Sequence, residues 1–146
     1  MPGSDLACVC SDLREATRVV TRLYDKALAG YGLTVTQFAI LRTVSRLGEP
    51  ALSDVARAMV MDRTSLYRTL TPMIEHGWIA VAPARSGHAK RARLTPAGAE
   101  RLAASEAGWR KVQDRFVGAF GEAEWATVST ALHKVLAVAG EAGDEA

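Results

Sequence analysis

The feature that most constrains the fold is a pair of short amphipathic segments near the middle of the chain. Residues 53–59 place apolar side chains at steps of three and four, and residues 62–76 do the same after a tight turn at residues 60–61. This period predicts two helices. Ser53 and Asp62 are residue types that cap helix N-termini, so we expect each of them to begin its helix. Two short helices joined by so tight a turn predict a helix-turn-helix.

A strand-like pattern follows directly after these helices. Residues 78–82 form an apolar run, residues 85–89 form a polar turn, and residues 91–94 alternate as a return strand. The pattern predicts an antiparallel β-hairpin. A hairpin placed directly after a helix-turn-helix is a wing, so residues 31–95 are predicted to form a winged helix-turn-helix lobe.

Long helices are predicted on both sides of this lobe. Apolar residues recur at helical spacing through residues 5–29, 96–120 and 125–138. These apolar stripes are larger than so small a core can cover, which predicts pairing with a second copy of the chain. The expected fold class is therefore mainly α with a small β-hairpin wing, in which residues 1–30 and 96–146 form a helical dimerisation region.

The composition excludes several other classes of protein. A chain of 146 residues with 49% hydrophobic and 23% charged residues fits one folded domain with helical extensions. The two cysteines are too few for a disulfide framework. No segment approaches the roughly 18 apolar residues of a membrane span, and no secretory signal is visible. We therefore expect a cytoplasmic protein with no membrane partner.

The charge of this chain is concentrated in one place. The net charge is only +2, but residues 84–95 contain four cations and no acid. Such a cluster repels itself unless an anionic partner is present, and a DNA duplex supplies that partner with counterion release as the driving force. The alternative is a basic loop that is simply solvated. The wing residues predicted to contact DNA are Arg85, His88, Lys90, Arg91 and Arg93.

The helix predicted over residues 62–76 carries the second candidate surface. If Leu66, Leu70, Met73 and Ile74 face the core, then several hydroxyls and two arginines face outward. An arginine can bind a guanine edge through two hydrogen bonds, and a helix N-terminus can bind phosphate. The alternative is an ordinary solvated helix face. The residues predicted to contact DNA here, together with Ser53 of the preceding helix, are Arg63, Thr64, Ser65, Tyr67, Arg68 and Thr69.

Four short pieces of sequence stand in a recognisable order along the chain. They are residues 32–41 (GLTVTQFAIL), 52–56 (LSDVA), 73–79 (MIEHGWI) and 94–98 (LTPAG). Each piece is weak alone, but together and in this order they resemble the MarR family of bacterial regulators. The resemblance covers nearly the whole chain.

This resemblance implies an obligate homodimer made by the first and the last two helices. The implied partner is double-stranded DNA carrying a pseudo-palindromic operator, with recognition helices in successive major grooves and wings in minor grooves. Family members usually repress genes until a small-molecule effector or an oxidant releases them from DNA. One departure concerns the wing, where the family typically has Asp-Arg and this chain has Ser86 and Gly87. The minor-groove contact then falls to Arg85, Lys90 or Arg91.

The cysteines offer one possible chemical switch. By resemblance to the organic-peroxide-sensing branch of the family, Cys10 stands near the reactive cysteine of the first helix. The tyrosines that polarise that thiol appear here as Arg14, Val35 and Phe38. Arg14, one helical turn from Cys10, can lower the pKa of the thiol through its charge. The alternative is a structural cysteine, because cysteine is among the most buried residue types.

A small-molecule effector is expected to bind between the dimer helices and the DNA-binding lobe. Tyr24, Phe38 and Trp109 are the predicted lining, with simple core packing as the alternative for each of them. The three histidines are too scattered for a metal site or a catalytic set. We therefore expect no enzyme activity, no metal and no cofactor. A second function class is a winged-helix protein-interaction module that docks an acidic protein and does not bind DNA sequence-specifically.

Overall fold

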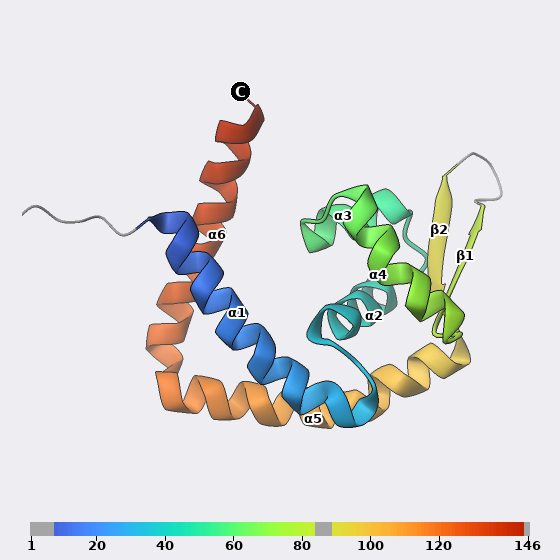
Figure 1. Cartoon of the computed structure of the whole chain (residues 1–146), viewed down its shortest axis with the longest axis horizontal. Helices are drawn as coiled ribbons and strands as arrows, with labels where there is room; N and C mark the ends of the chain where they lie inside the picture. The colour runs from blue at the N-terminus through green and yellow to red at the C-terminus, as the bar shows by residue number, and fades with distance from the viewer. Residues whose placement is uncertain (1–7, 84–88, 145–146) are drawn as a thin grey trace, which may run out of the picture. The chain divides into compact units, whose positions relative to one another are not determined.

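The computed structural model describes residues 8–83 and 89–144, which form helices and one two-stranded antiparallel sheet (Figure 1). The predicted mainly helical fold with a small hairpin is confirmed. The elements in chain order are α1 (Val9–Leu28), the short 3₁₀ helix η1 (Ala29–Tyr31), α2 (Val35–Leu47), α3 (Leu52–Met59), α4 (Arg63–Glu75), β1 (Ile79–Pro83), β2 (Lys90–Leu94), α5 (Pro96–Phe120) and α6 (Glu122–Asp144).

Side chains cap three of these helices, and the cap predicted at Asp62 is confirmed. Before α2, the backbone N–H of Gln37 donates to the Thr34 hydroxyl at 3.1 Å, and the Gln37 side chain accepts from the Thr34 N–H at 3.0 Å. Asp62 caps α4. The Thr95 hydroxyl accepts from the N–H of Gly98 at 3.0 Å at the start of α5. These bonds satisfy amides that have no partner inside the helix.

The predicted cap of α3 is wrong. The helix begins at Leu52, its N-cap is Ala51, two residues before Ser53, and no side chain caps it. The physical reason is tertiary, because Ala51 forms an isolated antiparallel bridge with Arg91 and is held in an extended conformation (φ −62°, ψ 149°). The helix can therefore start directly after Ala51, which places Ser53 inside the first turn.

The turn between α3 and α4 has an unusual backbone conformation. Val60 has φ of 51°, in the left-handed region, and its N–H closes α3 on the carbonyls of Ala56 and Arg57. A β-branched residue is uncommon in this conformation. The conformation reverses the chain within two residues and lets α4 start at Arg63.

The hairpin has the predicted antiparallel register, with Ile79 opposite Leu94 and Pro83 opposite Lys90. The predicted tip, which includes Arg85, Ser86, Gly87 and His88, lies outside the described residues. The outer edge of β2 is also paired. The N–H of Ala92 donates to the carbonyl oxygen of Pro50 at 3.0 Å.

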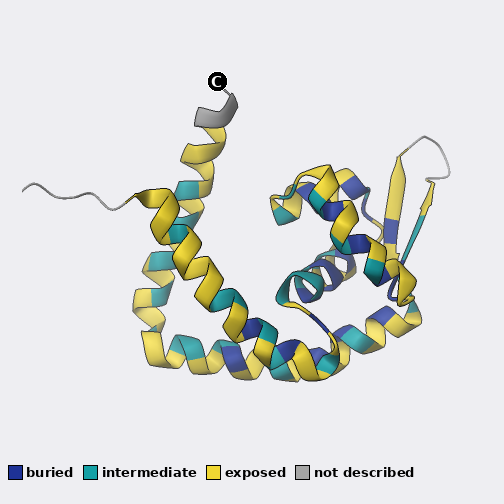
Figure 2. Cartoon of the chain, viewed as in Figure 1, coloured by how far each residue is buried: buried dark blue, intermediate teal, exposed yellow. Residues whose placement is uncertain are grey.

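The chain forms two compact units, Met1–Trp109 and Arg110–Ala146. In the first unit the core gathers on α2, α3, α4 and the hairpin, while α1 is mainly exposed (Figure 2). In the second unit Phe116 and Phe120 stack with ring centroids 5.9 Å apart, and Trp125 meets both rings edge-on. The predicted division into a lobe of residues 31–95 and a dimerisation region of residues 1–30 and 96–146 stays a prediction.

One part of the predicted core is wrong. Leu66, Leu70 and Met73 of α4 are almost fully buried, as expected, but Ile74 is 42% exposed. Ile74 follows Met73 and is turned about 100° from it around the helix. That rotation brings Ile74 to the edge of the buried stripe.

No helix in the described ranges is both long and apolar enough to cross a lipid bilayer.

The N-terminal half of α5 packs tightly on the end of the lobe. A Cβ atom on Gly98 would overlap the carbonyl oxygen of Trp78. Near it, the Arg101 guanidinium donates to the carbonyl oxygen of Tyr31 at 2.8 Å and lies over the Trp78 ring, 5.2 Å from its centroid. The absence of a side chain at residue 98 therefore sets how closely α5 approaches β1.

We predict that Gly98→Ala lowers the free energy of unfolding by about 1–3 kcal/mol, because backbone atoms must move to admit the methyl group. Urea denaturation followed by circular dichroism measures the change. Gly118→Ala in the same helix is the matched control, since a Cβ there meets no atom within 4 Å. The control should raise the free energy of unfolding by about 0.5–1 kcal/mol, because alanine favours helix over glycine. Equal effects of the two changes would contradict the prediction.

Candidate nucleic-acid interface

The exposed side of α4 presents four side chains from its first two turns. Arg63, Thr64, Tyr67 and Arg68 are exposed, whereas the opposite side of the helix is buried in the core. Among the described residues none of the four has a hydrogen-bond partner or an ion-pair partner for its side chain. Two guanidiniums, a phenol and a hydroxyl are therefore available together to a ligand.

The other two predicted residues of this helix are differently placed. Ser65 and Thr69 are only half-exposed. The Ser65 hydroxyl donates to the Asp62 carboxylate at 2.8 Å, and the Thr69 hydroxyl donates to the Ser65 carbonyl oxygen at 3.1 Å. Their hydroxyl protons are used inside the helix, so each keeps only acceptor capacity for a ligand. The structure therefore concentrates the donors of this surface on Arg63, Thr64, Tyr67 and Arg68.

The N-terminus of α4 carries a fixed negative charge. The Asp62 carboxylate accepts from the backbone N–H of Ser65 at 2.8 Å and from the Ser65 hydroxyl at 2.8 Å. These two hydrogen bonds to Ser65 lower the pKa of Asp62 below its ordinary value of 3.8. The bonds fix the first turn of the helix and hold the residues that follow in register.

The three described cations of the hairpin are all exposed, but they differ in their bonds. The Arg91 guanidinium donates to the carbonyl oxygen of Glu49 at 2.7 Å. Lys90 and Arg93 have no such partner among the described residues. Ser53 is exposed on α3. The predicted contacts Arg85 and His88 lie outside the described ranges.

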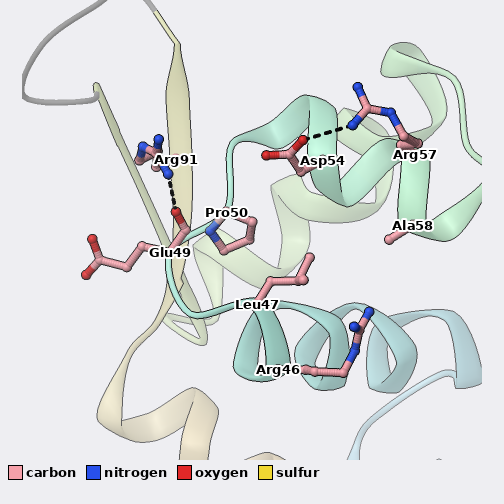
Figure 3. Close-up of a pocket in the computed structure, with 8 residues that line it drawn as sticks. All are labelled: Arg46, Leu47, Glu49, Pro50, Asp54, Arg57, Ala58 and Arg91. Atoms are coloured by element: carbon pink, nitrogen blue, oxygen red, sulfur yellow. Dashed lines mark hydrogen bonds and ion pairs between the residues drawn. The ribbon is translucent and has the colours of Figure 1, made fainter.

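A pocket of about 440 Å³ opens beside the hairpin, and sequence reasoning missed it (Figure 3). Its charged lining combines three arginines from three distant segments with two acids. The Arg57 guanidinium pairs with the Asp54 carboxylate at 3.1 Å. No sequence motif links these positions, because the fold alone brings them together. The lining residues are Arg46, Leu47, Glu49, Pro50, Asp54, Arg57, Ala58 and Arg91.

The predicted effector residues lie in or against the packed interior. Phe38 and Tyr24 are buried, and burial raises the pKa of the Tyr24 phenol. The rings of Phe38 and Trp109 stack with centroids 5.8 Å apart, and the Arg42 guanidinium covers the Trp109 ring at 4.4 Å. Phe38 and Trp109 thus pack directly against each other. This arrangement favours core packing for the pair, and their effector role stays a prediction.

The two cysteines are exposed and unbridged, so the alternative of a buried structural thiol does not hold within this chain. Cys8 is the N-cap of α1. The nearby backbone and hydroxyl of Ser11, and then the backbone of Cys10, lower the pKa of the Cys8 thiol. Sequence reasoning pointed to Cys10. The role of Cys10 stays a prediction, while the start of α1 at Val9 places Cys8 at the helix N-terminus, where a thiolate is stabilised.

Among the described residues, no three histidine, cysteine or acidic side chains lie close enough together to hold a metal ion.

A helix-turn-helix followed by a basic antiparallel hairpin defines a winged-helix protein. The family model of the MarR family matches residues 33–84. The chain belongs to the MarR family of transcriptional regulators. No curated protein matches the sequence.

Solved structures show the same relationship over nearly the whole chain. The transcriptional regulator MosR of M. tuberculosis, in complex with DNA, is 30% identical with a TM-score of 0.84, over 92% of this chain and 97% of that one. A transcriptional regulator from Pseudomonas aeruginosa is 22% identical with a TM-score of 0.80, over 88% and 97%. A mutant of E. coli MarR complexed with operator DNA is 19% identical with a TM-score of 0.79, over 88% and 93%. The last two similarities show a shared fold.

We predict that Asp62→Asn destabilises the protein near neutral pH and that this difference becomes smaller in acid. A lowered pKa means that the ionised Asp62 stabilises the folded state above its ordinary pKa of 3.8. The contribution is lost as the pH falls through the still lower pKa of the folded state. Urea midpoints of the wild type and the variant at pH 7 and pH 3 measure the change. If the urea midpoints of the wild type and the variant differed equally at both pH values, the charge on Asp62 would contribute nothing to stability.

Proposed function

We propose that this protein is a homodimeric, sequence-specific DNA-binding repressor of transcription that an effector releases from its operator. The observation that carries the proposal is the set of unpaired donors on the first two turns of α4, Arg63, Thr64, Tyr67 and Arg68, on a helix whose other side is buried. A rigid helix with one free polar side is the form that fits a DNA major groove.

The donor chemistry of α4 matches base edges. The guanidinium of Arg68 stands one helical turn after Thr64 on the exposed side, so both can reach the same stretch of groove. An arginine fork recognises the two acceptors of guanine, while a hydroxyl and a phenol can bond bases or phosphates. We assign base reading chiefly to Arg68 and Arg63.

The hairpin supplies the backbone contacts in this proposal. Lys90 and Arg93 are exposed. Among the described residues neither is paired with a carboxylate, so a phosphate can bind them without breaking an ion pair. Each phosphate that they neutralise releases counterions, which favours binding at low salt.

The homodimer is supported by large apolar side chains left exposed at both ends of the single chain. They include Val19 (59% exposed) on α1 and Leu136 (54%) and Val138 (57%) on α6. Water contact with such side chains is unfavourable, and a second copy would remove it. A symmetric dimer reads two half-sites, so the proposed target is a pseudo-palindromic operator. A role on DNA also supports a cytoplasmic location.

We predict that Arg68→Ala weakens operator binding by about 1–3 kcal/mol while leaving binding to unrelated DNA nearly unchanged. Lys90→Ala should weaken both kinds of binding and lower the slope of log Kd against log salt by about 1, because it removes a phosphate contact. Fluorescence anisotropy with a selected operator and a scrambled duplex measures both. If the wild type binds both duplexes equally and weakly, the repressor proposal fails and docking to an acidic protein becomes the better reading. If the two variants behave alike, our division into base reading and backbone contact is wrong.

Oxidant release is the effector mechanism that the cysteines support. A thiolate attacks the O–O bond of a peroxide, becomes a sulfenic acid and releases water or an alcohol. We predict that Cys8→Ser slows the release of operator DNA by cumene hydroperoxide more than Cys10→Ser does, because Cys8 stands at the N-terminus of α1, where the groups of Ser11 lower the pKa of its thiol. Gel shifts over time after peroxide addition compare the variants. If peroxide still released all operator DNA from a Cys8→Ser, Cys10→Ser double variant, the thiols would have no part in the mechanism.

A further inference from the structure

Among the described cations of the hairpin, only Arg91 donates a side-chain hydrogen bond to another segment of the chain. Its guanidinium donates to the main-chain oxygen of Glu49 at 2.7 Å, across the gap between β2 and the segment that joins α2 to α3 (Figure 3). A hydrogen bond from a charged donor is about twice as strong as a neutral one. The bond uses one of the five N–H donors of the guanidinium, and it holds the group at the α2–α3 segment, where Arg91 also lines the pocket.

Main-chain pairing joins the same two segments. The N–H of Ala92 donates to the Pro50 carbonyl oxygen at 3.0 Å, and Ala51 forms an antiparallel bridge with Arg91. The chain at Pro50 and Ala51 therefore pairs with the outer edge of β2 through an isolated bridge. The bond from the Arg91 side chain to Glu49 adds a second link beside this contact.

The need for these links follows from the small size of the sheet. A two-stranded hairpin alone is marginally stable in water. Here the hairpin contacts the α2–α3 segment through β2, and Ala92 is fully buried beneath it. The links at Glu49 and Pro50 thus hold the hairpin against the α2–α3 segment, in addition to the core packing of Ile79 and Ala92.

We infer that Arg91 is a positioning residue that fixes the hairpin against the α2–α3 segment, and that it is not one of the phosphate contacts of the hairpin. Lys90 and Arg93 carry those contacts. The inference rests on the proposed DNA binding for its functional consequence, but the positioning itself can be tested without DNA.

The first experiment measures hydrogen exchange of the Ala92 amide in the free protein by NMR. Arg91→Ala should speed this exchange about tenfold, equivalent to about 1.4 kcal/mol at 25 °C. Arg93→Ala is the matched control, because it removes the same charge from the same face of β2, where Arg93 has no partner among the described residues. The control should leave the exchange unchanged. Unchanged exchange in Arg91→Ala, or an equal increase in both variants, would overturn the inference.

The second experiment measures operator Kd over a range of salt concentrations. Arg91→Ala should raise Kd several-fold while the slope of log Kd against log salt stays that of the wild type. Loss of a phosphate contact would instead reduce the slope by about 0.9, and that result would overturn the inference. An unchanged Kd would also overturn it, since the position of the hairpin would then not matter for binding. If the wild type binds no operator, the proposed function fails, whereas the exchange experiment still decides the role of Arg91.

Discussion

The burial of one side of α4 is the constraint on which the rest of the candidate site depends. Leu66, Leu70 and Met73 are at most 1% exposed, and burying each such side chain contributes about 1.5–3 kcal/mol. Because a helix is rigid, fixing one side also fixes the other. Arg63, Thr64, Tyr67 and Arg68 are therefore presented together, without spending their donors on each other.

The structure also shows why residue type alone overestimates a binding surface. Six residues of α4 have suitable side chains, but the hydroxyl protons of Ser65 and Thr69 are already bonded within the helix. Serine and threonine readily bond to nearby backbone and side chains in this way. Whether they do so depends on rotamers, which the sequence does not specify.

The cations of the hairpin also differ in whether their side chains are already bonded within the protein. Lys90, Arg91 and Arg93 are equivalent in sequence, since each is a basic residue in an alternating strand. They differ in the structure because only the guanidinium of Arg91 reaches a carbonyl oxygen 42 residues away in the chain. The pocket beside the hairpin has the same origin, since Arg46, Arg57 and Arg91 come from three separate segments.

The sequence by itself determined the order of the elements, the turn between α3 and α4, and the cap at Asp62, because periodicity and capping act over a few residues. It also predicted the MarR family, from four short motifs. Only the tertiary structure decided that Ala51 is the N-cap of α3, that Cys8 is the N-cap of α1, and that Arg91 is bonded to the α2–α3 segment. Two of these depend on pairing between segments far apart in the chain, and the third depends on where a helix begins. Such contacts leave no periodic trace in the sequence.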